Sequence, residues 1–197
     1  MKIKLIIFFC IVIMLGGCVG ASTTGIFGSG VKVGLDPRSL GTQIDDTIMD
    51  KNIGTRLLLM NKNYFLSVKI KVLDGRIFIT GKVDGPEEKL KITKLAWETK
   101  GVRSVKNDLK IKEKFNFKQS AKDVLITSQL RTALIFNKKI KSGNYNIDTY
   151  KKKIYIYGIS GSEDETKEVI NEAKQILDVE DVVSSILLVD DLRIQKN

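Results

Sequence analysis

The sequence predicts an α+β protein that contains two tandem copies of one small domain. Each copy is expected to run α-β-β-α-β, with two helices packed on a three-stranded mixed sheet. Two observations predict this architecture. The sequence repeats itself without a gap at an offset of 77 residues, and helical and strand periodicities alternate in the same order within each copy.

Identical residues recur at this fixed offset over about 67 positions, which indicates an internal repeat rather than chance. The identical pairs include Asp46 with Asp123, Thr55 with Thr132, Leu57 with Leu134, Ile77 with Ile154, Ile79 with Ile156, Gly81 with Gly158, Glu88 with Glu165, Ala96 with Ala173, Val102 with Val179 and Val105 with Val182. Two copies of one domain therefore follow from the pairing.

A helix opens each copy, and we expect it over residues 46–60 and 123–136. Its apolar residues recur at i, i+4 and i+8, which places them on one face of a helix. They are Met49, Ile53 and Leu57 in the first copy and Ile126, Leu130 and Leu134 in the second. These stripes are predicted to face the two cores.

A β-hairpin follows the helix in each copy. In the first copy, apolar residues alternate with polar ones up to Asp74-Gly75, a dipeptide typical of a type I′ turn. In the second copy the turn is basic, Lys151-Lys152-Lys153. The alternating residues are Val68, Ile70, Val72, Ile77 and Ile79 in the first copy, and Tyr145, Ile147, Thr149, Ile154 and Ile156 in the second.

A second helix and a last strand complete each copy. Pro86 suits the first turn of the helix in the first copy, and Ser162 with Glu165 forms a capping box in the second. The last strands are predicted over residues 102–112 and 179–189. Because both helices cover one face of the sheet, the other face is predicted to be half-exposed or packed against the sibling copy.

Several of these features resemble the BON domain, a small module of exported bacterial proteins. The resemblance rests on an apolar strand that ends in glycine, at residues 77–81 and 154–158, and on a Val-x-x-Val start of the last strand. Residues 36–46 are similar to the segment before the first domain of a lipid-anchored family member. The resemblance implies two tandem BON domains, at residues 45–113 and 121–190.

The first 18 residues are predicted to be a signal peptide with a lipobox. The first four residues supply two positive charges, and the apolar run from Leu5 to Leu15 is too short to span a bilayer, which needs about 20 residues. Leu15-Gly16-Gly17-Cys18 resembles the bacterial lipobox, in which the cysteine is diacylated before cleavage. The alternative is an ordinary signal peptide followed by an incidental cysteine.

Residues 19–44 are rich in glycine and lack periodicity, so we expect a flexible tether. Val19, rather than aspartate, follows the cysteine, which resembles the sorting signal for the outer membrane. The family resemblance implies a lipid-anchored protein that faces the periplasm and binds anionic phospholipid such as phosphatidylglycerol or cardiolipin. It also implies a role in envelope integrity, with enrichment at the division site.

The composition argues against catalysis and cofactor binding. The chain has no histidine, which is the commonest general base and metal ligand, and the segment after Cys18 has no cysteine. We therefore expect a protein that is not an enzyme, with no catalytic residue, no metal and no cofactor. The net charge is +10, and an exported basic protein is expected to meet anionic lipid rather than nucleic acid.

A phospholipid-binding surface is predicted on the first helix of the second copy. One line of residues lies about 120° around this helix from the core stripe and is surplus to the core. It comprises Leu125, Gln129, Thr132 and Phe136, and the full set of predicted lipid-contacting residues adds Lys122, Arg131, Lys138 and Lys139. An apolar line beside a basic rim is typical of an interfacial helix. The family resemblance also implies that this helix contacts the lipid surface, although Leu125 stands where the family member has an aromatic residue.

Two alternatives remain open. Leu125 and Phe136 could instead pack on the first domain or on strand ends, with the neighbouring lysines merely solvated. The protein could also be an adaptor for an envelope-assembly or division partner that binds the half-exposed sheets or the surface around Trp97, while the lipid serves only as a tether. The acidic run at residues 163–165 is expected to cap a helix rather than to form a catalytic carboxylate pair.

Overall fold

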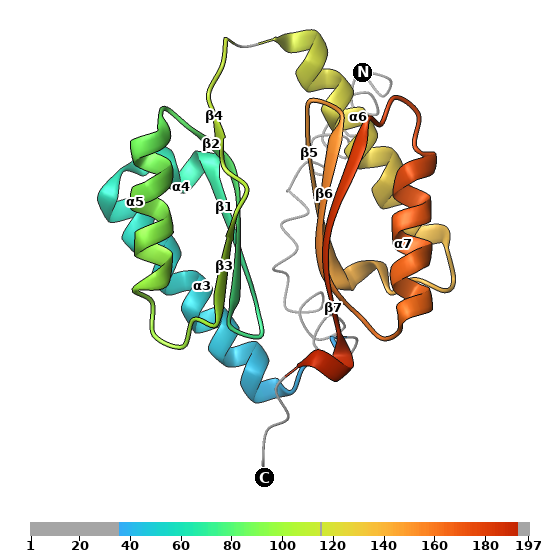
Figure 1. The fold of residues 1–197 in the computed structure, drawn as a ribbon, viewed down its shortest axis with the longest axis horizontal. Coiled ribbons are helices and arrows are strands. Elements are labelled where there is room, and N and C mark those ends of the chain that lie inside the picture. The colour runs from blue at the N-terminus through green and yellow to red at the C-terminus, as the bar shows by residue number, and fades with distance from the viewer. Residues whose placement is uncertain (1–35, 115, 193–197) are drawn as a thin grey trace, which may run out of the picture. The chain divides into compact units, whose positions relative to one another are not determined.

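The computed structural model describes residues 36–114 and 116–192 (Figure 1). The predicted signal peptide, Cys18 and residues 19–35 of the predicted tether lie outside the described residues. No helix in the described ranges is long and apolar enough to cross a membrane. The described residues all belong to one compact unit, so a chain that starts at residue 19 keeps every described element.

Both copies contain the predicted order of elements. The first comprises α3 (Leu40–Met60), α4 (Lys62–Ser67), β1 (Val68–Leu73), β2 (Arg76–Val83), α5 (Pro86–Trp97), β3 (Ser104–Asn107) and β4 (Lys110–Ile111). The second comprises α6 (Phe117–Phe136), the 3₁₀ helix η1 (Ser142–Asn144), β5 (Tyr145–Tyr150), β6 (Lys153–Ser160), α7 (Glu163–Gln175), β7 (Asp181–Leu188) and the 3₁₀ helix η2 (Val189–Asp191). The α+β fold with two mixed sheets is confirmed. The first copy adds α4 and divides the predicted last strand into β3 and β4, so its sheet has four strands rather than the predicted three.

Each sheet combines an antiparallel and a parallel pair. The hairpin strands pair antiparallel, β1 with β2 and β5 with β6. The last strands pair parallel with the second strand of each hairpin: β3 and β4 pair with β2, and β7 pairs with β6. A parallel pair needs a crossover connection, which α5 supplies in the first copy and α7 in the second.

Two separate cores contain the predicted helix stripes. Met49, Ile53 and Leu57 of α3 are buried in the first core, and Ile126, Leu130 and Leu134 of α6 are buried in the second. In each core they pack against the inward residues of the hairpin, such as Ile77 and Ile154. Each copy therefore has a complete core of its own.

The outer faces of the two sheets pack against each other (Figure 1). The buried residues of this third cluster are Leu73, Phe78, Tyr155, Tyr157 and Ile159. The ring centroids of Phe78 and Tyr157 lie 5.0 Å apart, and the Tyr157 hydroxyl donates to Asp108 Oδ2 at 2.7 Å. The sibling copy thus covers the second face of each sheet, which is one of the two predicted arrangements. The other arrangement, in which half-exposed sheets serve as an adaptor surface, is wrong.

Both opening helices begin earlier than predicted, at Leu40 and Phe117. Ser39 and Asn116 cap them, because each side chain accepts a hydrogen bond from a backbone N–H three residues on, at 3.2 and 3.0 Å. The predicted tether is therefore wrong for residues 40–44, which are helical. Periodicity alone misses these first turns, because the buried apolar stripe begins only at residues 49 and 126.

An aspartate of the opening helix holds the hairpin turn in each copy. Asp46 accepts hydrogen bonds from both N–H groups of the turn at residues 74–75, at 2.6 and 2.8 Å. Asp123 does the same for the turn at residues 151–152, at 2.9 Å each. The repeated aspartate therefore fixes the helix against the hairpin, and we call this arrangement the aspartate clamp.

Gly81 and Gly158 allow the chain that precedes the first strand to approach the second strand closely. Gly81 adopts a φ of +120°, and a Cβ there would lie 2.1 Å from the Ser67 carbonyl oxygen. A Cβ at Gly158 would lie 2.5 Å from Tyr145 Cδ1 and 2.6 Å from the Asn144 carbonyl oxygen. The repeated glycine is thus explained by packing within the fold.

Candidate phospholipid-binding surface

The predicted lipid-contacting line of α6 faces solvent. Leu125 and Phe136 point away from the buried stripe and are 58% and 79% exposed. Gln129 and Thr132 are exposed between them, and the Thr132 hydroxyl donates to the Ser128 carbonyl at 2.9 Å. The alternative in which Leu125 and Phe136 pack on the first domain or on strand ends is therefore wrong.

Three further apolar side chains of α6 are exposed, namely Phe117, Val124 and Ile135. Sequence reasoning missed them because it followed a single line along the helix, whereas they lie opposite the buried stripe. Phe117 also precedes the predicted start of the helix. The exposed apolar surface of α6 is consequently wider than predicted, and a complete helical wheel would have shown it.

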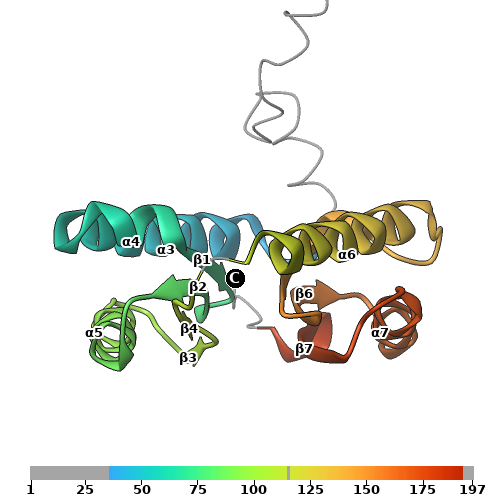
Figure 2. The ribbon, with the colours of Figure 1, turned by 90° about the horizontal axis from the view of Figure 1, so that it is seen from above.

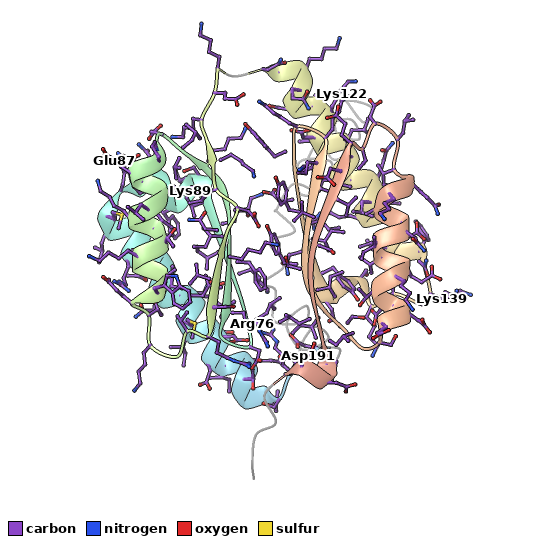
Figure 3. The ribbon with its side chains drawn as sticks, viewed as in Figure 1. Arg76, Glu87, Lys89, Lys122, Lys139 and Asp191 are labelled. Carbon is purple, nitrogen blue, oxygen red and sulfur yellow. The ribbon has the colours of Figure 1, made fainter. Side chains whose placement is uncertain are left out.

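Two lysines of the predicted rim form ion pairs. Lys122 Nζ lies 3.0 Å from Asp178, and Lys139 Nζ lies 2.9 Å from Glu168. The hydrogen bond from each ammonium lowers the pKa of its carboxyl partner, and the hydrogen bond to Glu168 raises the pKa of Lys139. Figure 3 labels both lysines, which lie near opposite ends of α6. Each of these two lysines thus has a carboxylate partner at the protein surface.

The other basic residues of the predicted rim are exposed but dispersed. The Arg131 guanidinium donates to the Ile147 carbonyl at 3.3 Å, and Lys138 is exposed just beyond the end of α6. The structure therefore brings Leu125 and Phe136 together with the polar residues between them on one helix face. It does not gather the predicted cations into one rim beside that face.

The outward face of α6 carries no carboxylate. Asp123 is the acidic residue of this helix, and its oxygens accept hydrogen bonds from the turn at residues 151–152. An apolar helix face without negative charge can approach an anionic leaflet without electrostatic repulsion. Its leucine and phenylalanine side chains can then insert at the boundary between headgroups and acyl chains.

Glu165, in the acidic run of α7, has structural partners. The Ser162 hydroxyl accepts from the Glu165 N–H at 3.1 Å, as the predicted capping box requires. The Glu165 carboxylate accepts from the N–H groups of Gly161 at 3.0 Å and Lys141 at 2.8 Å, rather than from that of Ser162. Within residues 36–114 and 116–192, no group of three or more carboxylate, cysteine or histidine residues is placed to hold a metal ion.

The repeated α-β-β-α-β unit, with its paired helices on one face of a mixed sheet, defines a class of small α+β modules. The chain matches the BON domain family over residues 45–113 and 122–190, and it belongs to this family.

Three relatives extend the match beyond a single domain. The chain is 33% identical over 131 residues to a protein of Anaplasma centrale described as "Uncharacterized protein in gshII 5'region", covering 66% of this chain and 87% of the relative. It is 28% identical over 162 residues to the outer membrane lipoprotein DolP of Haemophilus influenzae, covering 79% and 80%. It is 23% identical over 128 residues to the 21 kDa hemolysin of Actinobacillus pleuropneumoniae, covering 63% and 64%.

Proposed function

We propose that this chain is an outer-membrane lipoprotein that faces the periplasm, is anchored through an acylated Cys18, and docks on anionic phospholipid with α6. The docking supports envelope integrity and concentrates the protein at the division site, without catalysis or a cofactor. Similarity to the DolP lipoprotein of H. influenzae supports the location. The observation that carries the docking is the exposure of Leu125 and Phe136 on a helix with no outward carboxylate.

The proposed mechanism is adhesion at two points. Acyl chains on Cys18 hold the protein at the membrane, and residues 19–35 separate this cysteine from the first described residue. A segment of this length spans at most about 60 Å when fully extended, so the domains stay near the surface. Docking of α6 then occurs at an effective concentration on the order of millimolar, and a weak contact suffices.

Apolar insertion is the larger contribution to the proposed docking. Full burial of a leucine or phenylalanine side chain contributes about 1.5–3 kcal/mol. Lys122 and Lys139 already have carboxylate partners, so they add less attraction to an anionic leaflet than unpaired lysines would. We therefore expect binding that depends strongly on Leu125 and Phe136 and only partly on ionic strength.

Vesicle co-sedimentation tests the docking. The chain from residue 19 is mixed with phosphatidylglycerol-containing or pure phosphatidylcholine vesicles, at low and at high salt. We expect binding to the anionic vesicles that weakens with salt, because the Debye length falls from about 10 Å at 0.1 M to about 3 Å at 1 M. Leu125→Asp is expected to lower this binding on the order of tenfold.

Leu90→Asp is the matched control, because Leu90 is also an exposed leucine but lies on α5. It is expected to bind as the unaltered chain does. An equal loss in the two variants, or an unaltered chain that binds neither kind of vesicle, would contradict docking through α6.

A protein-interaction adaptor is the second candidate, in which the lipid serves only as a tether for an envelope-assembly or division partner. The ion pairs of Lys122 and Lys139 favour it, because they reduce the charge offered to lipid. Trp97, which is 52% exposed at the end of α5, offers such a partner an apolar side chain to contact. Salt separates the two candidates, since an apolar protein interface is not weakened by ionic strength whereas attraction to an anionic leaflet is.

A further inference from the structure

α3 carries exposed apolar side chains at the same repeat positions as α6. The exposed pairs at the offset of 77 residues are Leu40 with Phe117, Ile48 with Leu125, Leu58 with Ile135, and Leu59 with Phe136. Ile48 is 63% exposed against 58% for Leu125, and Leu59 is 81% exposed against 79% for Phe136. Packing within either copy does not require these side chains, so the cores do not explain their recurrence.

The outward arc of α3 also lacks carboxylates. At about 100° per residue, the exposed apolar residues lie opposite the buried stripe, and the same arc contains Lys51. Asp46 points inward to the clamped turn, and Asp45 and Asp50 lie outside this arc. The first copy thus offers an anionic surface the same combination of apolar and non-acidic residues as the second.

The two opening helices lie on the same side of the paired sheets. Figure 2 shows α3, α4 and α6 along one side and α5 and α7 along the other. α4 adds the exposed Leu66 to the side of α3. α7 carries three acidic residues in its first turn, at residues 163–165. A flat surface that meets α3 and α6 therefore leaves the acidic helix on the far side.

We propose that α3 is a second membrane-contacting helix, so that both copies dock on the same anionic phospholipid surface. The inference rests on the proposed docking of α6 and extends that surface to the first copy. α3 begins at Leu40, closer along the chain to Cys18 than any other described helix, so the proposed anchor brings this helix to the bilayer. The position of α3 and α6 on the same side of the paired sheets and the absence of outward carboxylates favour a bilayer over a protein partner.

Site-specific labelling tests the contact of each helix separately. The chain from residue 19 has no cysteine, so Ile48→Cys, Leu125→Cys and the control Leu90→Cys each carry one environment-sensitive fluorophore. Each labelled chain is mixed with phosphatidylglycerol-containing vesicles, with or without a nitroxide-labelled lipid. We expect the nitroxide to quench the fluorophore at positions 48 and 125 but not at position 90.

The outcomes distinguish the two proposals. Quenching at position 125 without quenching at position 48 would overturn the role of α3 and leave the docking of α6 intact. Quenching at position 48 alone would overturn the docking of α6, and with it the proposal that both copies dock, and quenching at neither position would overturn the contact of both helices. Equal quenching at all three positions would mean non-specific adsorption. A concentration-dependent signal at position 48 without vesicles would assign α3 to self-association.

Charge and polarity variants measure how much α3 contributes to binding. Ile48→Asp is expected to lower binding to anionic vesicles on the order of tenfold, and its loss should multiply with that of Leu125→Asp because the two sites are separate. Circular dichroism melting checks the fold. If Ile48→Asp lowers the Tm, Lys51→Glu at an exposed position replaces it, with an expected several-fold loss. Unchanged binding in a folded variant would overturn the inference.

Discussion

The two copies form the same hairpin turn from different residues. The turn at residues 74–75 is Asp-Gly, with φ values of 53° and 73°, whereas the turn at residues 151–152 is Lys-Lys, with φ values of 49° and 62°. Glycine adopts this left-handed region freely, but the Cβ of lysine crowds the backbone there. Both turns keep one conformation although their residues differ, and the aspartate clamp is the feature that they share.

The clamp is more deeply buried in the first copy than in the second. The side chains of Asp46 and Arg38 are 3% and 8% exposed, and they lie 2.5 Å apart. Arg38 also pairs with Asp36 at 2.5 Å. Asp123 is half-buried and accepts instead from the neutral Gln119 carboxamide at 3.0 Å. The first copy thus adds a buried ion pair to the hydrogen bonds that both copies share.

Removal of the clamp is the largest expected effect. Asp46→Ala leaves two buried turn N–H groups without their acceptor and removes one of the two carboxylates that pair with Arg38. We expect a loss of about 3–5 kcal/mol in the free energy of unfolding. Asp123→Ala removes hydrogen bonds from a half-buried site, and about 1–3 kcal/mol is expected. Urea unfolding of both variants measures the difference.

Asp45→Ala serves as the control for the clamp variants, because it removes an exposed carboxylate next to Asp46. Its free energy of unfolding is expected to change by less than about 0.5 kcal/mol. Equal losses for Asp46→Ala and Asp123→Ala would show that the deeper burial of the first clamp does not add to the stability of the fold.

Substitution of the repeated glycine is expected to give the next largest difference in stability between the two copies. Gly81→Ala combines a positive φ with a backbone oxygen 2.1 Å from the new Cβ, and we expect a loss of about 2–4 kcal/mol. At Gly158 the new Cβ would also lie 2.6 Å from a backbone oxygen, that of Asn144, but the backbone does not adopt a positive φ there, so about 1–3 kcal/mol is expected for Gly158→Ala. Thermal unfolding tests the order, and a larger loss for Gly158→Ala would reverse it.

Much of the fold could be predicted from the sequence, because each element carries a local pattern. The stripe that contains Ile53 and the stripe that contains Leu130 identified the buried helix faces. The Asp74-Gly75 dipeptide identified a two-residue turn, and the fixed offset transferred each assignment to the other copy. Leu125 and Phe136 were predicted to be surplus to the core, and both are exposed.

The rest depended on tertiary contacts that no local pattern encodes. Phe78 and Tyr157 alternate correctly for an outward strand face, but only the pairing of the two sheets buries them. Lys122 and Asp178 are far apart in sequence, so their ion pair required the position of α6 relative to the end of α7. The apolar face of α3 was missed because residues surplus to the core were sought only on the opening helix of the second copy, although Ile48, Leu58 and Leu59 lie within the helix predicted for the first.

Exchange of the turn residues between the copies is expected to change the stability least. Lys152→Gly relieves a left-handed lysine and is expected to raise the Tm by about 2–4 °C, although it also removes the ion pair between Lys152 and Glu180. Lys152→Ala is the control, because it removes the same ion pair but keeps the Cβ, so it should not raise the Tm. The reverse change, Gly75→Lys, places a Cβ 2.9 Å from the Gly101 carbonyl oxygen and should lower the Tm. If Gly75→Lys leaves the Tm unchanged, the clamp alone determines the turn in both copies, and the glycine of the first copy adds nothing to it.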